Sequence, residues 1–75
     1  MPHVTIKMYP GHEESVKQEL AMDIKKLLVE RLGVKEGAVS VSIQEVESQN
    51  WKQEVYDADI TDTKKKLYIA PGYKM

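Results

Sequence analysis

The sequence lacks cysteine and phenylalanine, has one tryptophan, and contains no apolar run long enough to cross a membrane. Without cysteine, no disulfide bond can stabilise this chain of 75 residues, although domains of that size usually need a disulfide, a metal or a partner subunit. The two histidines, His3 and His12, belong to no cluster with the spacing of metal ligands. We therefore predict support from a partner subunit and no metal site.

An excess of charge of one sign is also lacking, since 11 basic and 12 acidic residues give a net charge of −1. So small a charge creates no long-range field that would attract nucleic acid or an anionic membrane. The N-terminus has no basic segment followed by an apolar one, as a secretory signal would have. We expect a single domain over residues 1–75, a cytoplasmic location, and neither nucleic acid nor membrane as partner.

Two segments, PHVTIKMY and AVSVSIQEV, alternate apolar and polar residues with the period of a strand that has one buried face. The apolar positions are Val4, Ile6, Met8, Val39, Val41 and Ile43, and the polar positions include Thr5, Lys7, Ser40 and Ser42. In this alternation Pro2 is in phase with the apolar face, whereas His3 falls on the opposite face.

Between these strands, apolar residues recur at spacings of three and four from Val16 to Leu32, which predicts an amphipathic helix of about five turns. We expect the helix to begin between residues 12 and 15, where Ser15 and Gln18 fit a capping box, and to end at a left-handed Gly33. Its apolar stripe is predicted to be core.

Strand, helix and strand with short connections predict an α/β fold, a βαβ unit with parallel strands and a right-handed crossover. One or two short helices should follow and end before Pro71. A two-stranded sheet is too narrow to be stable alone, so we expect a homodimer that extends the sheet across subunits.

The residue after Met1 is Pro2, and methionine is normally removed before so small a residue. The mature chain would then begin with a secondary amine. An α-amino group has a reference pKa of about 7.7 to 8.0, and burial beside apolar walls disfavours its charged form. Such an amine suits a general base at cellular pH.

The whole chain resembles the 4-oxalocrotonate tautomerase family in its initiating MP, in PHVTIKMYPG, and in VSVSIQEV leading to an aromatic residue. The closing PGYKM is most similar to the dimeric bacterial branch. The resemblance implies a βαβ protomer, a four-stranded sheet across a homodimer rather than a hexamer, and no cofactor. It also implies that Pro2 is the general base and acid in an enol–keto proton transfer, and that Trp51 shapes the substrate pocket.

Two positions depart from the family pattern. Where its best-known members carry two arginines that hold a dicarboxylate, this chain has His12 and Ser40. Neither residue makes the bidentate contact of a guanidinium with a carboxylate. We predict that His12, Ser40 and Trp51 contact the substrate, an enolpyruvate-type or 2-hydroxy-alkenoate acid such as phenylenolpyruvate.

Two other functions stay open on the sequence. In the first, Pro2 is a promiscuous amine that forms an iminium with an aldehyde, or directs water onto an unsaturated or halogenated acid. In the second, the chain is a non-catalytic dimeric βαβ module whose proline is idle, and Trp51 is a core or interface anchor.

Overall fold

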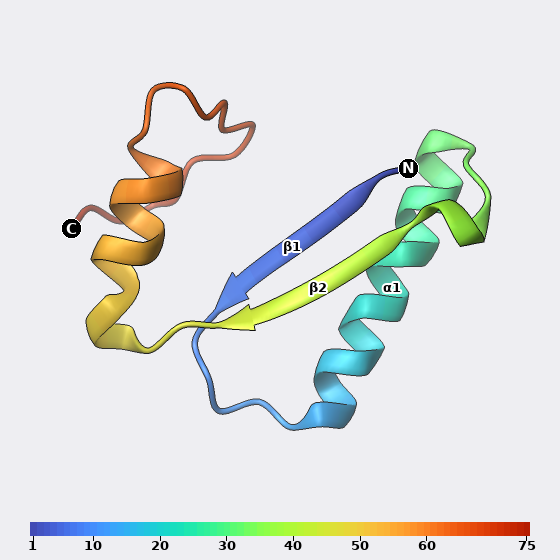
Figure 1. The fold of residues 1–75 in the computed structure, drawn as a ribbon, viewed down its shortest axis with the longest axis horizontal. Helices are drawn as coiled ribbons and strands as arrows, with labels where there is room; N and C mark the ends of the chain where they lie inside the picture. Colours follow the sequence, from blue (N-terminus) through green and yellow to red (C-terminus); the bar gives the residue numbers. More distant parts are fainter. The chain divides into compact units, whose positions relative to one another are not determined.

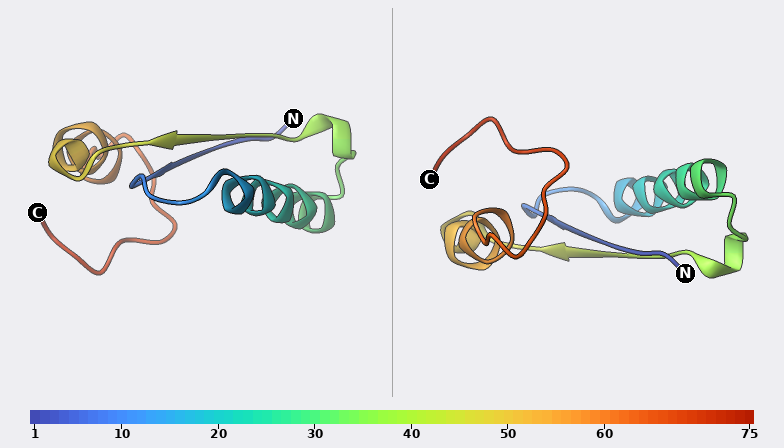
Figure 2. Two further views of the ribbon diagram at one scale, coloured as in Figure 1. Left: turned by 90° about the horizontal axis from the view of Figure 1, so that it is seen from below. Right: turned by 90° about the horizontal axis from the view of Figure 1, so that it is seen from above.

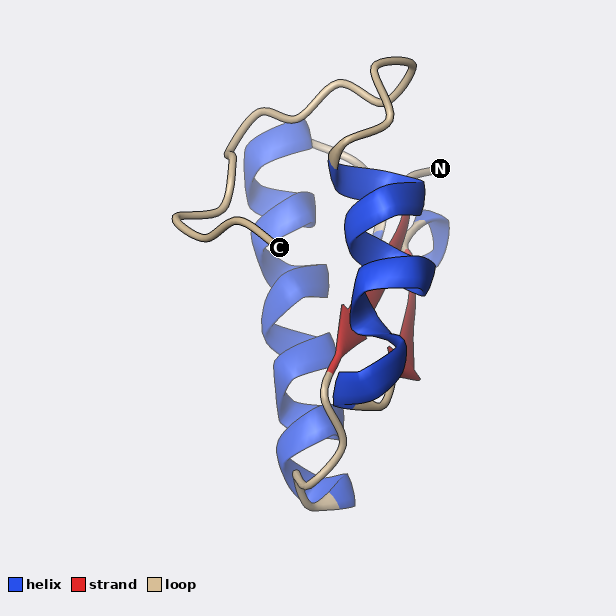
Figure 3. Cartoon of the chain, turned by 90° about the vertical axis from the view of Figure 1, so that its left-hand side faces the viewer, coloured by secondary structure: helices blue, strands red, loops and turns tan.

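The structure, a computed structural model, describes residues 1–75, which form two compact units, Met1–Glu45 and Val46–Met75. The first unit contains strand β1 (His3–Met8), helix α1 (Glu14–Leu32), the 3₁₀ turn η1 (Glu36–Ala38) and strand β2 (Ser40–Glu45) (Figure 1). The second contains the 3₁₀ turn η2 (Ser48–Asn50) and the π-helix η3 (Lys52–Ile60), and no helix or strand follows Ile60. Figure 3 colours these helices and strands by type.

The two strands of the first unit are parallel and pair in a register that runs from His3 opposite Ser40 to Met8 opposite Glu45. Helix α1 connects them and lies on one face of the sheet (Figure 2). Val4 and Ile6 are half-buried, whereas His3 is exposed, as the alternation predicts. The predicted βαβ unit with parallel strands is confirmed.

The two ends of α1 follow different rules. Its C-terminus is the predicted one, because Gly33 adopts a left-handed conformation with φ of 66° and donates its backbone N–H to the Val29 carbonyl at 3.0 Å. Its N-terminus lies within the predicted range of residues 12–15, because the helix begins at Glu14. The capping box does not form, since Ser15 lies inside the helix and the N-cap, Glu13, makes no side-chain capping bond. No helix of the chain has both the length and the apolar character needed to span a membrane.

The apolar stripe of α1 is not a core in the single chain, which corrects the prediction. None of its residues is buried, and Val16, Leu27 and Leu32 are 47%, 50% and 57% exposed. The physical reason is the width of the sheet, because two strands about 5 Å apart cover only part of a helix that is 10–12 Å across. The stripe therefore leaves apolar surface uncovered.

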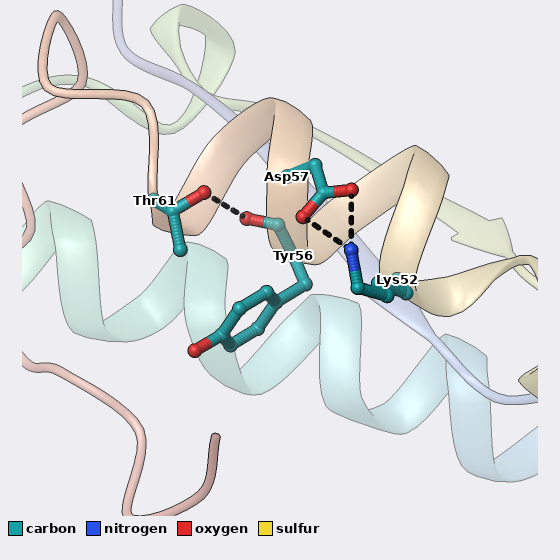
Figure 4. A network of polar contacts seen from close by, with 4 residues as sticks. All are labelled: Lys52, Tyr56, Asp57 and Thr61. Carbon is teal, nitrogen blue, oxygen red and sulfur yellow. Dashed lines mark hydrogen bonds and ion pairs between the residues drawn. The ribbon is translucent and has the colours of Figure 1, made fainter. Parts of the chain in front are cut away.

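The second unit winds with hydrogen bonds between residues five apart. The backbone N–H of Thr61 donates to the Tyr56 carbonyl at 2.9 Å, and the Thr61 hydroxyl donates to the same oxygen at 3.3 Å. Lys52 Nζ pairs with the Asp57 carboxylate at 3.0 Å, again five residues on (Figure 4). The predicted short helices before Pro71 are confirmed, and η3 has the wider π form.

Candidate active site

Pro2 stands directly before β1 and is half-buried, whereas Met1 is fully exposed. The Pro2 carbonyl accepts a hydrogen bond of 3.2 Å from the backbone N–H of Ser40. This bond is the first one between the two strands, so Pro2 is attached to the sheet although it lies outside β1. The residue ahead of it, Met1, projects into solvent.

Four polar side chains form a ladder on the sheet face that α1 does not cover. Nδ1 of His3 lies 2.6 Å from the Ser40 hydroxyl, and Nε2 of the same ring lies 3.2 Å from the Thr5 hydroxyl. The Ser42 hydroxyl donates to Thr5 Oγ1 at 3.2 Å. We call His3, Thr5, Ser40 and Ser42 the polar ladder. All four residues are exposed, and each contacts at least one other member across or along the strands.

The bond between His3 and Ser40 was not predicted from the sequence. Alternation correctly placed His3 on the same face as Thr5 and Ser40. Contact across two parallel strands also depends on the register of their pairing. A short turn between two strands lets the sequence fix that register, but these strands are joined by a long helical crossover. The only signal was the shared polar face.

His12 lies away from Pro2 within one chain. It is exposed in the loop between the end of β1 and the start of α1, next to Gly11, whose φ of 116° favours glycine. Pro2 is at the other end of β1 (Figure 1). A six-residue strand spans about 20 Å, so one small substrate does not reach both residues of the same chain.

Trp51 belongs to an aromatic group in the second unit. Its indole N–H donates to the Tyr73 hydroxyl at 3.0 Å, and the ring of Tyr73 lies 5.8 Å from that of Tyr56, at an angle of 36°. Trp51 is half-buried, so part of its ring stays accessible. Tyr73 was not predicted as its partner, because 22 residues separate them and no periodic pattern links the two.

Charge gathers at the carboxyl ends of the strands. Lys17 of α1 pairs with Glu14 at 3.2 Å and with Glu45, the last residue of β2, at 3.3 Å. The hydrogen bond to Glu14 raises the pKa of Lys17 above 10.5, desolvation opposes it, and Glu45 adds to the rise. No three His, Cys, Asp or Glu side chains come close enough together to hold a metal ion.

Comparison with protein families and curated proteins gives a consistent result. The family model described as "Tautomerase enzyme" matches residues 2–56, a span that begins at Pro2. A probable tautomerase of Xylella fastidiosa is 38% identical over 73 residues, which cover 97% of this chain and 89% of that protein. Tautomerase PptA of Cronobacter sakazakii is 37% identical, and the match covers both chains completely.

Solved structures agree with the sequence comparisons. YwhB, a homologue of 4-oxalocrotonate tautomerase, matches with a TM-score of 0.60 at 30% identity, over 61% of this chain and 75% of that one. TomN, another homologue of that enzyme, shares the fold with a TM-score of 0.65 at 22% identity, over 67% of this chain and 77% of its own. The chain therefore belongs to the 4-oxalocrotonate tautomerase family and is an isomerase.

Proposed function

We propose that this tautomerase converts enols to ketones with the amine of Pro2 as general base and general acid, after removal of Met1. The observation that carries the proposal is the position of Pro2. Met1, the residue ahead of Pro2, is fully exposed. The Pro2 carbonyl accepts a hydrogen bond from Ser40, and the family match starts at Pro2. Removal of Met1 turns an amide nitrogen, which has no basicity, into a secondary amine.

The chemistry needs one proton-transfer group. The neutral Pro2 amine takes the proton from the enol hydroxyl, the C–O bond becomes a carbonyl, and the electron pair of the C=C bond moves to the distal carbon. That carbon then receives a proton from the Pro2 ammonium, which restores the amine. Substrate and product have the same composition, so the step requires no oxidant or reductant. We accordingly propose that it proceeds without a cofactor.

For the substrate we propose a monocarboxylate with an apolar or aromatic tail, such as phenylenolpyruvate. Where the best-known members of the family carry two arginines that hold a dicarboxylate, this chain has the imidazole of His12 and the hydroxyl of Ser40. Both groups bind carboxylates more weakly than a guanidinium does. The half-buried Trp51 offers a ring face for an aromatic tail. His12, Ser40 and Trp51 as substrate contacts stay predictions.

We further propose that the active form is a homodimer with a four-stranded sheet. In one chain the sheet has only β1 and β2, each with an open edge, and the stripe of α1 is half exposed. Because Pro2 and His12 are at opposite ends of β1, a substrate that contacts both would have to bind between two copies.

The test is ketonisation of phenylenolpyruvate, followed by loss of enol absorbance, with protein whose intact mass confirms loss of Met1. We expect a rate well above that of buffer, and a fall of about 100-fold or more in Pro2→Ala. Pro10→Ala, a change at an exposed proline of the turn after β1, is the matched control and should keep the wild-type rate. Protein that retains Met1 should be inactive.

Two other outcomes of these experiments would favour the alternative functions. Equal rates for wild type and Pro2→Ala, both near that of buffer, would contradict the proposal and favour the non-catalytic module. An aldehyde adduct fixed by borohydride and located on the Pro2 nitrogen by peptide mapping would instead favour the iminium chemistry.

A further inference from the structure

We infer that Ser40 is a positioning residue for the reaction: it attaches the start of β1 to β2 at two points and so aims the Pro2 amine. This inference rests on the proton transfer proposed above, and for Ser40 it replaces the predicted substrate contact with the contact to His3. Ser40 binds the Pro2 carbonyl through its backbone N–H at 3.2 Å, and its hydroxyl lies 2.6 Å from Nδ1 of His3, the next residue along the chain. Both bonds hold the chain directly after the Pro2 nitrogen.

The attachment is needed because Pro2 lies at a chain terminus, where ends fray unless they are tied down. Pro2 precedes β1, and the bond from Ser40 is the first one of the sheet. Proline has no side-chain rotamers, so the direction of its nitrogen depends on the backbone at residues 2 and 3. Fixing the His3 side chain restricts that backbone.

The His3 ring is itself held from both sides. Its Nε2 lies 3.2 Å from the Thr5 hydroxyl, which also accepts a hydrogen bond from Ser42. A hydroxyl can donate to or accept from a ring nitrogen, so the ring keeps both partners in either neutral tautomer. The ladder thus fixes His3 in one orientation, while the ring stays on the opposite face of β1 from the half-buried Val4.

A positioning role for Ser40 has a different kinetic signature from a direct substrate contact. A contact that binds substrate and transition state equally changes KM, whereas misalignment of the base lowers kcat. In Ser40→Ala the backbone N–H remains but the hydroxyl is lost, so we expect kcat for phenylenolpyruvate to fall about 10-fold with little change in KM. Ser40→Thr keeps the hydroxyl and should restore most of kcat.

Two controls make the result specific. Ser15→Ala removes an exposed hydroxyl of α1 and leaves the polar ladder unchanged, and kcat should change less than about twofold. In a double-mutant cycle, Ser40→Ala should have almost no further effect in the background of His3→Ala, because Ser40 acts through His3. Additive losses, or a rise in KM with unchanged kcat, would overturn the inference in favour of direct substrate contact.

A second readout needs no turnover. The ¹⁵N order parameter of the His3 amide should fall from about 0.85, typical of rigid backbone, towards about 0.6 in Ser40→Ala, and should not fall in Ser15→Ala. If wild type does not convert phenylenolpyruvate, the proposed function fails while this readout still decides the attachment. An order parameter unchanged by Ser40→Ala would overturn the inference whatever the activity.

Discussion

At the scale of single residues, the bond between Trp51 and Tyr73 has a built-in reporter, because Trp51 is the only tryptophan of the chain. In Tyr73→Phe the indole N–H loses its acceptor while the aromatic ring at position 73 is kept. We expect a loss of about 1 kcal/mol in the free energy of unfolding, the typical net value of a hydrogen bond. Urea titration followed by Trp51 fluorescence measures it.

Tyr68 provides the matched control for that change. It is 94% exposed, against 45% for Tyr73, so Tyr68→Phe removes a hydroxyl that is mostly in water. Its urea midpoint and its emission maximum should match those of wild type. If the two variants behave alike, the bond to Trp51 contributes nothing measurable to stability.

The residues of the site were predictable to different degrees. Pro2 could be singled out from the sequence as a candidate, because the amine chemistry proposed for it depends only on its place after Met1. The polar face with His3 and Ser40 was also predictable from alternation, but their bond was not, since it depends on register. The aromatic partner of Trp51 could not be predicted, because the segment that carries Tyr73 has no periodic structure.

At the scale of elements, the C-terminus of α1 depends on Gly33. An alanine there would have to adopt a φ of 66°, in the left-handed region where a Cβ atom costs about 1–2 kcal/mol. We expect Gly33→Ala to lower the free energy of unfolding by about 1 kcal/mol, measured by circular dichroism during urea unfolding. Gly37→Ala is the control, because Gly37 has no positive φ and a Cβ there would meet no atom within 4 Å. Equal losses in both variants would contradict this account.

The other end of α1 yields a pH-dependent prediction. Hydrogen bonding to Glu14 raises the pKa of Lys17 above 10.5 in the folded chain, so the charged form stabilises the fold. This contribution is fully present below 10.5 and is lost as the pH rises through the raised pKa. Lys17→Met should therefore be slightly less stable than wild type at neutral pH, and the difference should shrink in more alkaline solution.

Urea midpoints between pH 7 and a pH above 10.5 measure this difference. Lys26→Met, at an exposed position of the same helix, controls for the loss of one positive charge. A difference between wild type and Lys17→Met that stays constant across the whole range would show that the ion pairs with Glu14 and Glu45 do not couple folding to the protonation of Lys17.

The elements show where periodicity suffices for prediction. It located β1, α1 and β2 correctly, because each has a regular apolar pattern over six residues or more. It did not reveal the N-cap, since Ser15 and Gln18 satisfy a capping pattern two residues too late. Nor did it reveal the π form of η3, in which the partner of Lys52 is five residues away at Asp57.

At the scale of the whole molecule, the uncovered stripe of α1 predicts self-association. Multi-angle light scattering should give a mass of about twice the 8.6 kDa of one chain. Leu27→Glu, at a half-exposed position of the stripe, should shift the protein towards the monomer if the stripe contributes to the interface. Glu30→Gln, at an exposed position of the same helix, is the control. A monomeric wild type at micromolar concentration would contradict the homodimer.

Whole-molecule features were the least predictable from the sequence. The parallel order of the strands followed from the helical crossover, and it is confirmed. The stripe was assigned to a core because amphipathic helices usually have one. That rule does not say which chain supplies the covering surface, and the two strands of a single chain are too narrow for it.

The full exposure of Met1 has a practical consequence for anyone who produces this protein. A purification tag fused ahead of Pro2 would project into solvent and leave the hydrogen bond from Ser40 to the Pro2 carbonyl intact. Under the proposed mechanism, such a fusion would fold normally and pass every structural quality check, yet have no basic nitrogen. A screen of tagged clones would score it as inactive, so the tag belongs after Met75.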